Sequence, residues 1–123
     1  MSTFIVRAKV WKIGKPQSAR DLDMIVGTGA TYTTLPVEFL RELGLEPIRK
    51  TKLRMANGRI VQRDLGEAVI SIQGRRTVTP VVFGNQNIRL LGAVTLEELS
   101  FAANAVAREL VPTEAYLLVS QGR

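Results

Sequence analysis

The chain has 123 residues, 46% of them hydrophobic and 23% charged, which is typical of one globular domain and too apolar for a disordered chain. It contains no cysteine and no histidine, which excludes thiolate nucleophiles, disulfides, Cys/His zinc sites and Ser-His-Asp triads. A net charge of +6 favours anionic partners. Because there is neither a secretory signal nor a run of the ~20 apolar residues that a membrane helix needs, we expect one cytoplasmic domain over residues 1–123 with no membrane partner.

Two strands are predicted at the N-terminus. Residues 3–11 alternate between an apolar side and a side that carries Arg7 and Lys9, which is the period of a half-buried strand. Trp11 has the parity of the outer side, so we expect it to be exposed. A turn around residues 14–18 leads into a second strand over residues 21–26, which we expect to form a hairpin with the first.

A short helix and a projecting hairpin follow. Pro36 precedes apolar positions that stop at Gly44, and an early proline with a glycine after the last turn is typical of a short helix. Within residues 52–63, Asn57-Gly58 separates two extended runs. This dipeptide predicts a tight β-hairpin turn, in which both residues must tolerate positive φ.

The C-terminal half contains two further strands, over residues 68–72 and 77–83, joined near Gly74 in a mostly antiparallel sheet. Pro80 predicts a sheet edge or a bulge, because proline cannot donate to the ladder. Residues 95–99 are predicted to be helical, with Thr95 as N-cap and Glu98 completing a capping box. Residues 102–110 fit a helical stripe, while residues 110–111 and 116–119 suit short strands, and the sequence leaves this choice open.

The segment from Ile25 to Pro36 contains Gly27-Thr28-Gly29-Ala30 directly after an apolar strand. It resembles the active-site loop of the retropepsin-like aspartic proteases, in which such a strand runs into Asp-Thr-Gly-Ala or Asp-Thr-Gly-Ser. Leu90-Leu91-Gly92-Ala93, before a helix, resembles the segment that crosses the active-site strand in that family. The resemblance runs from about residue 4 to residue 112. It implies an all-β fold, a closed barrel or sandwich with a flap hairpin and one or two short helices.

Gly27 stands where that family has its catalytic aspartate. In the family each subunit of a homodimer supplies one carboxylate, and the two share a proton and hold the attacking water. The only aspartates here are Asp21, Asp23 and Asp64, and Asp23 lies about 13 Å back along its strand. We therefore expect an aspartic endopeptidase scaffold that is inactive, either by natural loss or by an introduced substitution. The alternative is a peptide-binding relic of the same fold that turns over no substrate in any form.

The resemblance also implies roles for other residues. Thr28 would donate or accept a hydrogen bond across the dimer axis, and Gly29 would permit the close backbone approach that this contact needs. The substrate, a peptide or an unfolded protein, would be bound by Ala30, Met55, Ala56, Asn57, Gly58, Leu91 and Gly92. No metal and no cofactor are expected.

Six positive charges lie across the predicted flap and its base, with acidic residues only at the borders. One interpretation is a solvated hairpin whose charges keep an exposed edge from pairing with other chains. Another is an electrostatic preference for acidic peptides or for a phosphate backbone. Because aromatic residues that stack bases are scarce here, we regard nucleic-acid binding as the weaker hypothesis. The six are Arg49, Lys50, Lys52, Arg54, Arg59 and Arg63.

Overall fold

A computed structural model describes residues 3–117 of the chain. Within this range no helix has the length and apolar character to cross a membrane. In chain order the elements are β1 (Ile5–Trp11), a 3-10 turn (Pro16–Ser18), β2 (Arg20–Val26), β3 (Thr33–Pro36), α1 (Val37–Glu42), β4 (Arg49–Arg54), β5 (Ile60–Ile72), β6 (Arg75–Gly84), β7 (Leu90–Leu91), α2 (Ala93–Leu99), β8 (Phe101–Asn104) and β9 (Glu109–Pro112).

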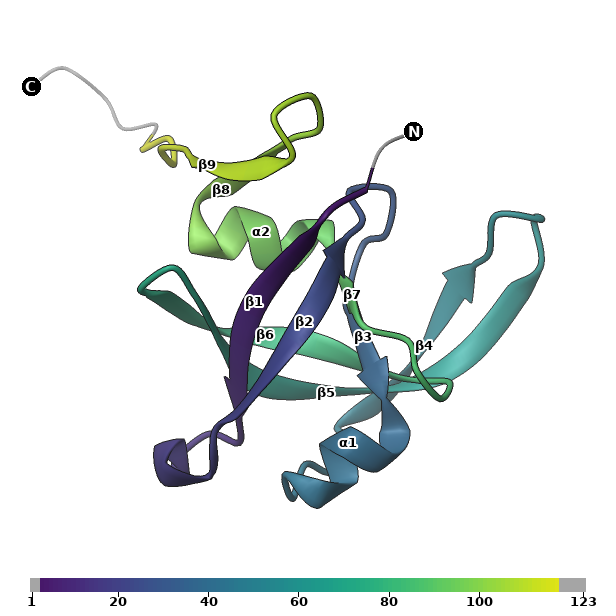
Figure 1. Ribbon diagram of the computed structural model, residues 1–123. Helices are drawn as coiled ribbons and strands as arrows, with labels where there is room; N and C mark the ends of the chain where they lie inside the picture. The colour runs from purple at the N-terminus through teal and green to yellow at the C-terminus, as the bar shows by residue number, and fades with distance from the viewer. Residues whose placement is uncertain (1–2, 118–123) are drawn as a thin grey trace, which may run out of the picture.

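The strands form a closed ring, which confirms the expected all-β fold. The order is β1-β2-β7-β3-β6-β5, and β1 closes the ring by pairing with β5 as well as with β2. Within residues 3–117, only β2–β7 and β3–β6 are parallel pairs. β4 continues the sheet outward from β5, and the β4–β5 hairpin projects away from the ring (Figure 1). The β8–β9 hairpin and α1 lie at opposite ends of the molecule in the same view.

The core fills the ring because the strands alternate as their sequences predict. Ala8 and Val10 of β1 are buried, while Arg7 and Lys9, which alternate with them, are exposed. β2 repeats this pattern with Leu22, Met24 and Val26 buried. The two helices cover the ring with further apolar side chains, Leu40 from α1 and Leu96 and Leu99 from α2.

The expectation that Trp11 is exposed is wrong. Its side chain is only 8% exposed. Trp11 lies opposite Val69 of β5, and it borders a hollow that is also lined by Gly14 and Pro16 of the following turn. Parity predicts exposure only where one face of a strand meets water, and here the cross-strand neighbour Val69 and the turn after β1 lie beside Trp11 on that face.

The turn of the β4–β5 hairpin differs in detail from the one expected. The Gly58 amide donates to the Met55 carbonyl (2.9 Å) and the Met55 amide to the Arg59 carbonyl (2.8 Å). Gly58 has a φ of +87°, whereas Asn57 has a negative φ and accepts a hydrogen bond from the Arg59 amide through its side-chain oxygen (3.0 Å). The hairpin is confirmed, but with a three-residue loop in which only the glycine needs positive φ.

The capping box at Thr95 is also wrong. α2 begins two residues earlier, with Gly92 as its N-cap, and no side chain caps it. Thr95 lies inside the helix and is fully buried. The helix begins where the chain leaves β7, so the position of this strand, rather than a local capping side chain, fixes its start.

Two further predictions concern β6 and the C-terminal residues. Pro80 lies within β6, an internal strand with an unbroken register to β5, but β3 pairs with β6 only from Val81 onward. Pro80 therefore lies in a stretch of β6 where β3 does not pair with it, so that edge needs no amide donor. Residues 101–112 form the β8–β9 hairpin, so the helical alternative is wrong. Tyr116 and Leu117 belong to no strand, and residues 118–119 lie outside the described residues.

Candidate functional site

The two motifs singled out in the sequence meet in space. β7 lies between β2 and β3, parallel to the first and antiparallel to the second. The Gly27 amide donates to the Leu91 carbonyl (3.0 Å), and the amides of Ala93 and Val94 donate to the carbonyls of Ala30 and Thr31 (2.8 and 2.9 Å). The segment around Gly92 therefore crosses under the loop that follows β2 and is bonded to it on both sides.

Gly92 is required at this crossing. A Cβ atom there would collide with the carbonyl group of Tyr32 and the amide of Thr33, which are backbone atoms that cannot swing aside. The Gly92 amide donates to the hydroxyl of Thr33 (3.1 Å). That hydroxyl lies 2.6 Å from the hydroxyl of Thr95, which lies 2.8 Å from the hydroxyl of Thr79. This buried chain of hydroxyls, which we call the threonine chain, joins α2 to β3 and β6.

Gly27 directly follows β2 and begins a turn in which the Ala30 amide donates to the Gly27 carbonyl (3.0 Å). Its φ is not in the left-handed region, so the backbone there accommodates any residue. The space beside it is occupied: a Cβ on residue 27 would lie 2.5 Å from Leu90 Cδ1. A side chain at position 27 therefore requires Leu90 to move, and Cδ1 is the free end of a flexible side chain.

Thr28 and Gly29 form the exposed tip of the same turn. A Cβ atom on Gly29 would meet no described atom within 4 Å, and its φ is not left-handed. Neither crowding nor backbone conformation within the described chain therefore requires glycine at this position.

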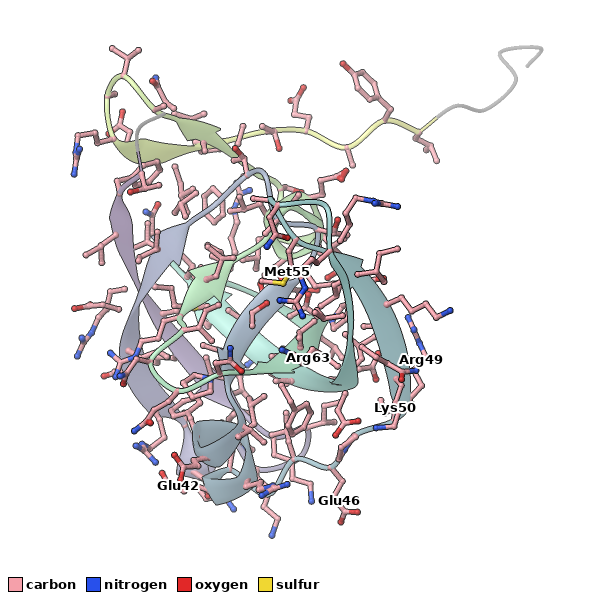
Figure 2. All side chains as sticks on the ribbon, turned by 90° about the vertical axis from the view of Figure 1, so that its right-hand side faces the viewer. Glu42, Glu46, Arg49, Lys50, Met55 and Arg63 are labelled. Atoms are coloured by element: carbon pink, nitrogen blue, oxygen red, sulfur yellow. The ribbon has the colours of Figure 1, made fainter. Side chains whose placement is uncertain are left out.

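A cleft of about 450 Å³ lies between this loop and β4. Gly29 and Ala30 border it, whereas the hairpin tip from Met55 to Gly58 is exposed outside its lining. Leu91 and Gly92 are buried and support the loop from below. Figure 2 shows Met55 at the end of the hairpin, Arg49 and Lys50 along its outer edge, and Arg63 on its inner side.

Most of the cleft lining escaped the sequence analysis. Leu53 of β4 could have been found from its parity, since it shares an inner, half-buried face with Val61 of β5. Tyr32 and Val82 meet in the cleft only because β3 pairs with β6, a parallel pairing that the sequence does not indicate. The lining residues not singled out from the sequence are Thr31, Tyr32, Thr34, Thr51, Leu53 and Val82, whereas Lys52 and Arg54 were expected as part of the basic hairpin.

Among the residues that the structure describes, no carboxylate borders the cleft. Each of the three aspartates forms an ion pair on the surface. Asp21 pairs with Lys9 (3.7 Å), Asp23 with Arg7 (3.0 Å) and Asp64 with Lys50 (2.9 Å). Among residues 3–117 there is also no group of three or more acidic side chains that could hold a metal ion. The cleft therefore offers hydroxyls, backbone groups, Lys52 and Arg54 for chemistry.

Comparison with known proteins agrees with this geometry. A search of curated proteins finds no significant match. The solution structure of simian foamy virus (mac) protease is similar in fold, with a TM-score of 0.57 and 22% sequence identity over 77% of this chain and 93% of that one. A family model described as aspartyl protease matches residues 12–97, which include the loop, the β4–β5 hairpin and β7. The chain thus belongs to the aspartyl protease family and has its retropepsin-like fold.

Proposed function

We propose that residues 1–123 form one domain, that two copies associate as a homodimer around a shared peptide-binding cleft, and that the chain as given does not hydrolyse peptides. The observation that carries the proposal is Gly27, which directly follows β2, is bonded to β7 and stands two residues before the cleft-lining Gly29, while no carboxylate of residues 3–117 borders the cleft. In an aspartic protease two carboxylates share a proton and activate water at this point. A two-fold axis here would bring together two glycines instead.

The dimer is supported by the tip of the loop. Thr28 is exposed at the tip of the loop, where a partner loop would meet its hydroxyl, and nothing within the described chain explains the glycine at position 29. Close approach of a second copy would explain it, because a glycine lets two backbones come together. In a symmetric dimer each Thr28 would meet its counterpart across the axis.

Peptide binding is supported by the β4–β5 hairpin, which we interpret as a flap. β4 is the outermost strand of the sheet, so its outer edge is unpaired, and four consecutive residues of it border the cleft. An extended peptide between β4 and the loop would pair its backbone with this edge. The half-buried Leu53 and Tyr32 would contact its side chains.

Restoring the missing carboxylate tests the proposal. Gly27→Asp should allow the dimer to cleave an unfolded protein, best at mildly acidic pH where the pair of carboxylates holds one proton. Because Leu90 Cδ1 lies in the way, Gly27→Asp should also be made with Leu90→Val, which removes that atom. Gly27→Asn, which has the same size but no carboxylate, is the matched control and should be inactive.

Three results would count against parts of the proposal. Cleavage by the unmodified chain would refute the assignment of inactivity to Gly27. If the unmodified chain sediments as a monomer throughout the micromolar range, the proposed cleft shared by two copies is refuted. Failure of a folded, dimeric Gly27→Asp/Leu90→Val variant to cleave any peptide of a diverse library would favour the second candidate, a peptide-binding relic. That candidate is favoured by Leu90, which fills the space beside Gly27.

A further inference from the structure

The positive charges of the β4–β5 hairpin are largely uncompensated. Between Glu46 and Asp64 the chain carries six Lys and Arg and no acidic residue. Within residues 3–117, this stretch forms one ion pair, between Lys50 and Asp64 (2.9 Å). Arg54 donates to the Gly58 carbonyl (3.2 Å), a bond that leaves its charge without a counter-ion.

Two of these cations border the cleft. Lys52 and Arg54 are part of its lining, and both are exposed. They are two residues apart on β4, so their side chains leave the same face of the strand, about 7 Å apart along it. Because consecutive residues 51–54 all border the cleft, it runs along the edge of β4 rather than over one face.

We infer that this cleft selects extended peptides with acidic side chains at alternate positions, an inference that rests on the proposed peptide-binding function. A peptide strand beside β4 places every second side chain on the face of Lys52 and Arg54. Two carboxylates spaced i and i+2 then reach both cations. Two adjacent carboxylates point to opposite faces, and only one of them reaches this pair.

A phosphate backbone is the competing source of negative charge. Single-stranded nucleic acids bind through a basic groove together with aromatic side chains on which bases stack. Of the described residues that border the cleft, Tyr32 alone is aromatic, and the hairpin residues 49–63 contain no aromatic residue. The cleft therefore suits carboxylates on a peptide better than a run of stacked bases.

Fluorescence anisotropy on the full chain tests the inference by measuring peptide affinity. Because the chain is proposed not to hydrolyse peptides, no inactivating substitution is needed. Four labelled peptides share one apolar extended sequence and carry two Glu at i and i+2, two Glu at i and i+1, two Gln, or two Lys at i and i+2. The alternating Glu peptide should bind between about twofold and 30-fold tighter than the Gln peptide, the range for two exposed ion pairs. The adjacent Glu peptide should fall between them and the Lys peptide should bind weakest. High salt should shrink these differences.

Matched variants separate local from overall charge. Lys52→Gln/Arg54→Gln should bind the alternating Glu and Gln peptides equally well. Lys15→Gln/Arg76→Gln removes the same charge from exposed residues outside the cleft lining and should keep the preference. Circular dichroism and thermal melting would establish that both variants remain folded.

The outcomes distinguish this inference from the proposed function. Equal binding of the Glu and Gln peptides by the unmodified chain would overturn the acidic preference and leave peptide binding intact. Binding of none of the peptides at millimolar concentration would overturn both. A single-stranded oligonucleotide that binds tighter than the alternating Glu peptide, with loss of affinity in Lys52→Gln/Arg54→Gln, would overturn the inference in favour of nucleic acid.

Discussion

Replacing Thr95 with valine should destabilise the fold, because Thr95 is the middle member of the threonine chain. Its hydroxyl lies 2.6 Å from that of Thr33 and 2.8 Å from that of Thr79, and all three residues are 0% exposed. Valine keeps the shape of threonine but removes both hydrogen bonds. The hydroxyl of Thr79 is then buried without its partner, while that of Thr33 still accepts a hydrogen bond from the Gly92 amide.

The expected loss follows from these contacts. A buried hydroxyl left without a partner costs about 1–3 kcal/mol, and the weakened Thr33 site adds roughly 1 kcal/mol. We therefore expect the free energy of unfolding to fall by about 2–4 kcal/mol. Urea denaturation measures it: with a slope near 2 kcal/mol/M, the midpoint should drop by about 1–2 M. All variants must be compared at one protein concentration, because an associating chain is stabilised by its partner.

Two control variants separate the hydroxyl from the packing. Thr95→Ser keeps the hydroxyl and loses one methyl group, at a cost of about 1 kcal/mol. Thr79→Val/Thr95→Val removes both ends of one hydrogen bond and should cost less than the two single changes added together. If Thr95→Val changes stability by less than about 0.5 kcal/mol, or Thr95→Ser costs as much as Thr95→Val, the threonine chain does not hold α2 as we argue.

Two other substitutions test the loop and its support. Thr28→Ala should weaken the proposed dimer by about 1–3 kcal/mol for each lost hydrogen bond, and two-fold symmetry applies this loss twice. Sedimentation over a concentration series measures the association constant, and an unchanged constant would contradict the contact. Gly92→Ala should destabilise the fold by about 2 kcal/mol or more in urea, because its Cβ collides with the backbone of Tyr32. Gly29→Ala, which meets no described atom, is the control and should leave the stability of the isolated chain unchanged.

Local chemistry made several elements predictable from the sequence. The alternation of residues 3–11 predicts β1, because a strand with one buried face must repeat every two residues. Gly44 after the last turn of α1 has the φ of +86° that glycine adopts readily. Asn57-Gly58 predicts the hairpin, although only the glycine takes positive φ. The resemblance of residues 25–36 and 90–93 to the retropepsin-like proteases predicts the fold that the ring of strands confirms.

Tertiary structure decided the features that depend on residues far apart in the chain. Trp11 is buried beside its cross-strand neighbour Val69 and the turn after β1, and parity within one strand cannot detect a distant strand. Thr95 has a local pattern typical of an N-cap, but its hydroxyl bonds to residues 62 and 16 positions away.

The features of the cleft likewise differ in whether residue type or long-range pairing decides them. The sequence alone determined that no aspartate stands at position 27 and that the hairpin is basic, because residue type needs no coordinates. Only the fold decided that Leu90 fills the space beside Gly27 and that Lys52 and Arg54 border the cleft with Tyr32. Those contacts arise from the pairings of β7 with β2 and of β3 with β6, and such long-range register is set by how the whole ring closes around its core.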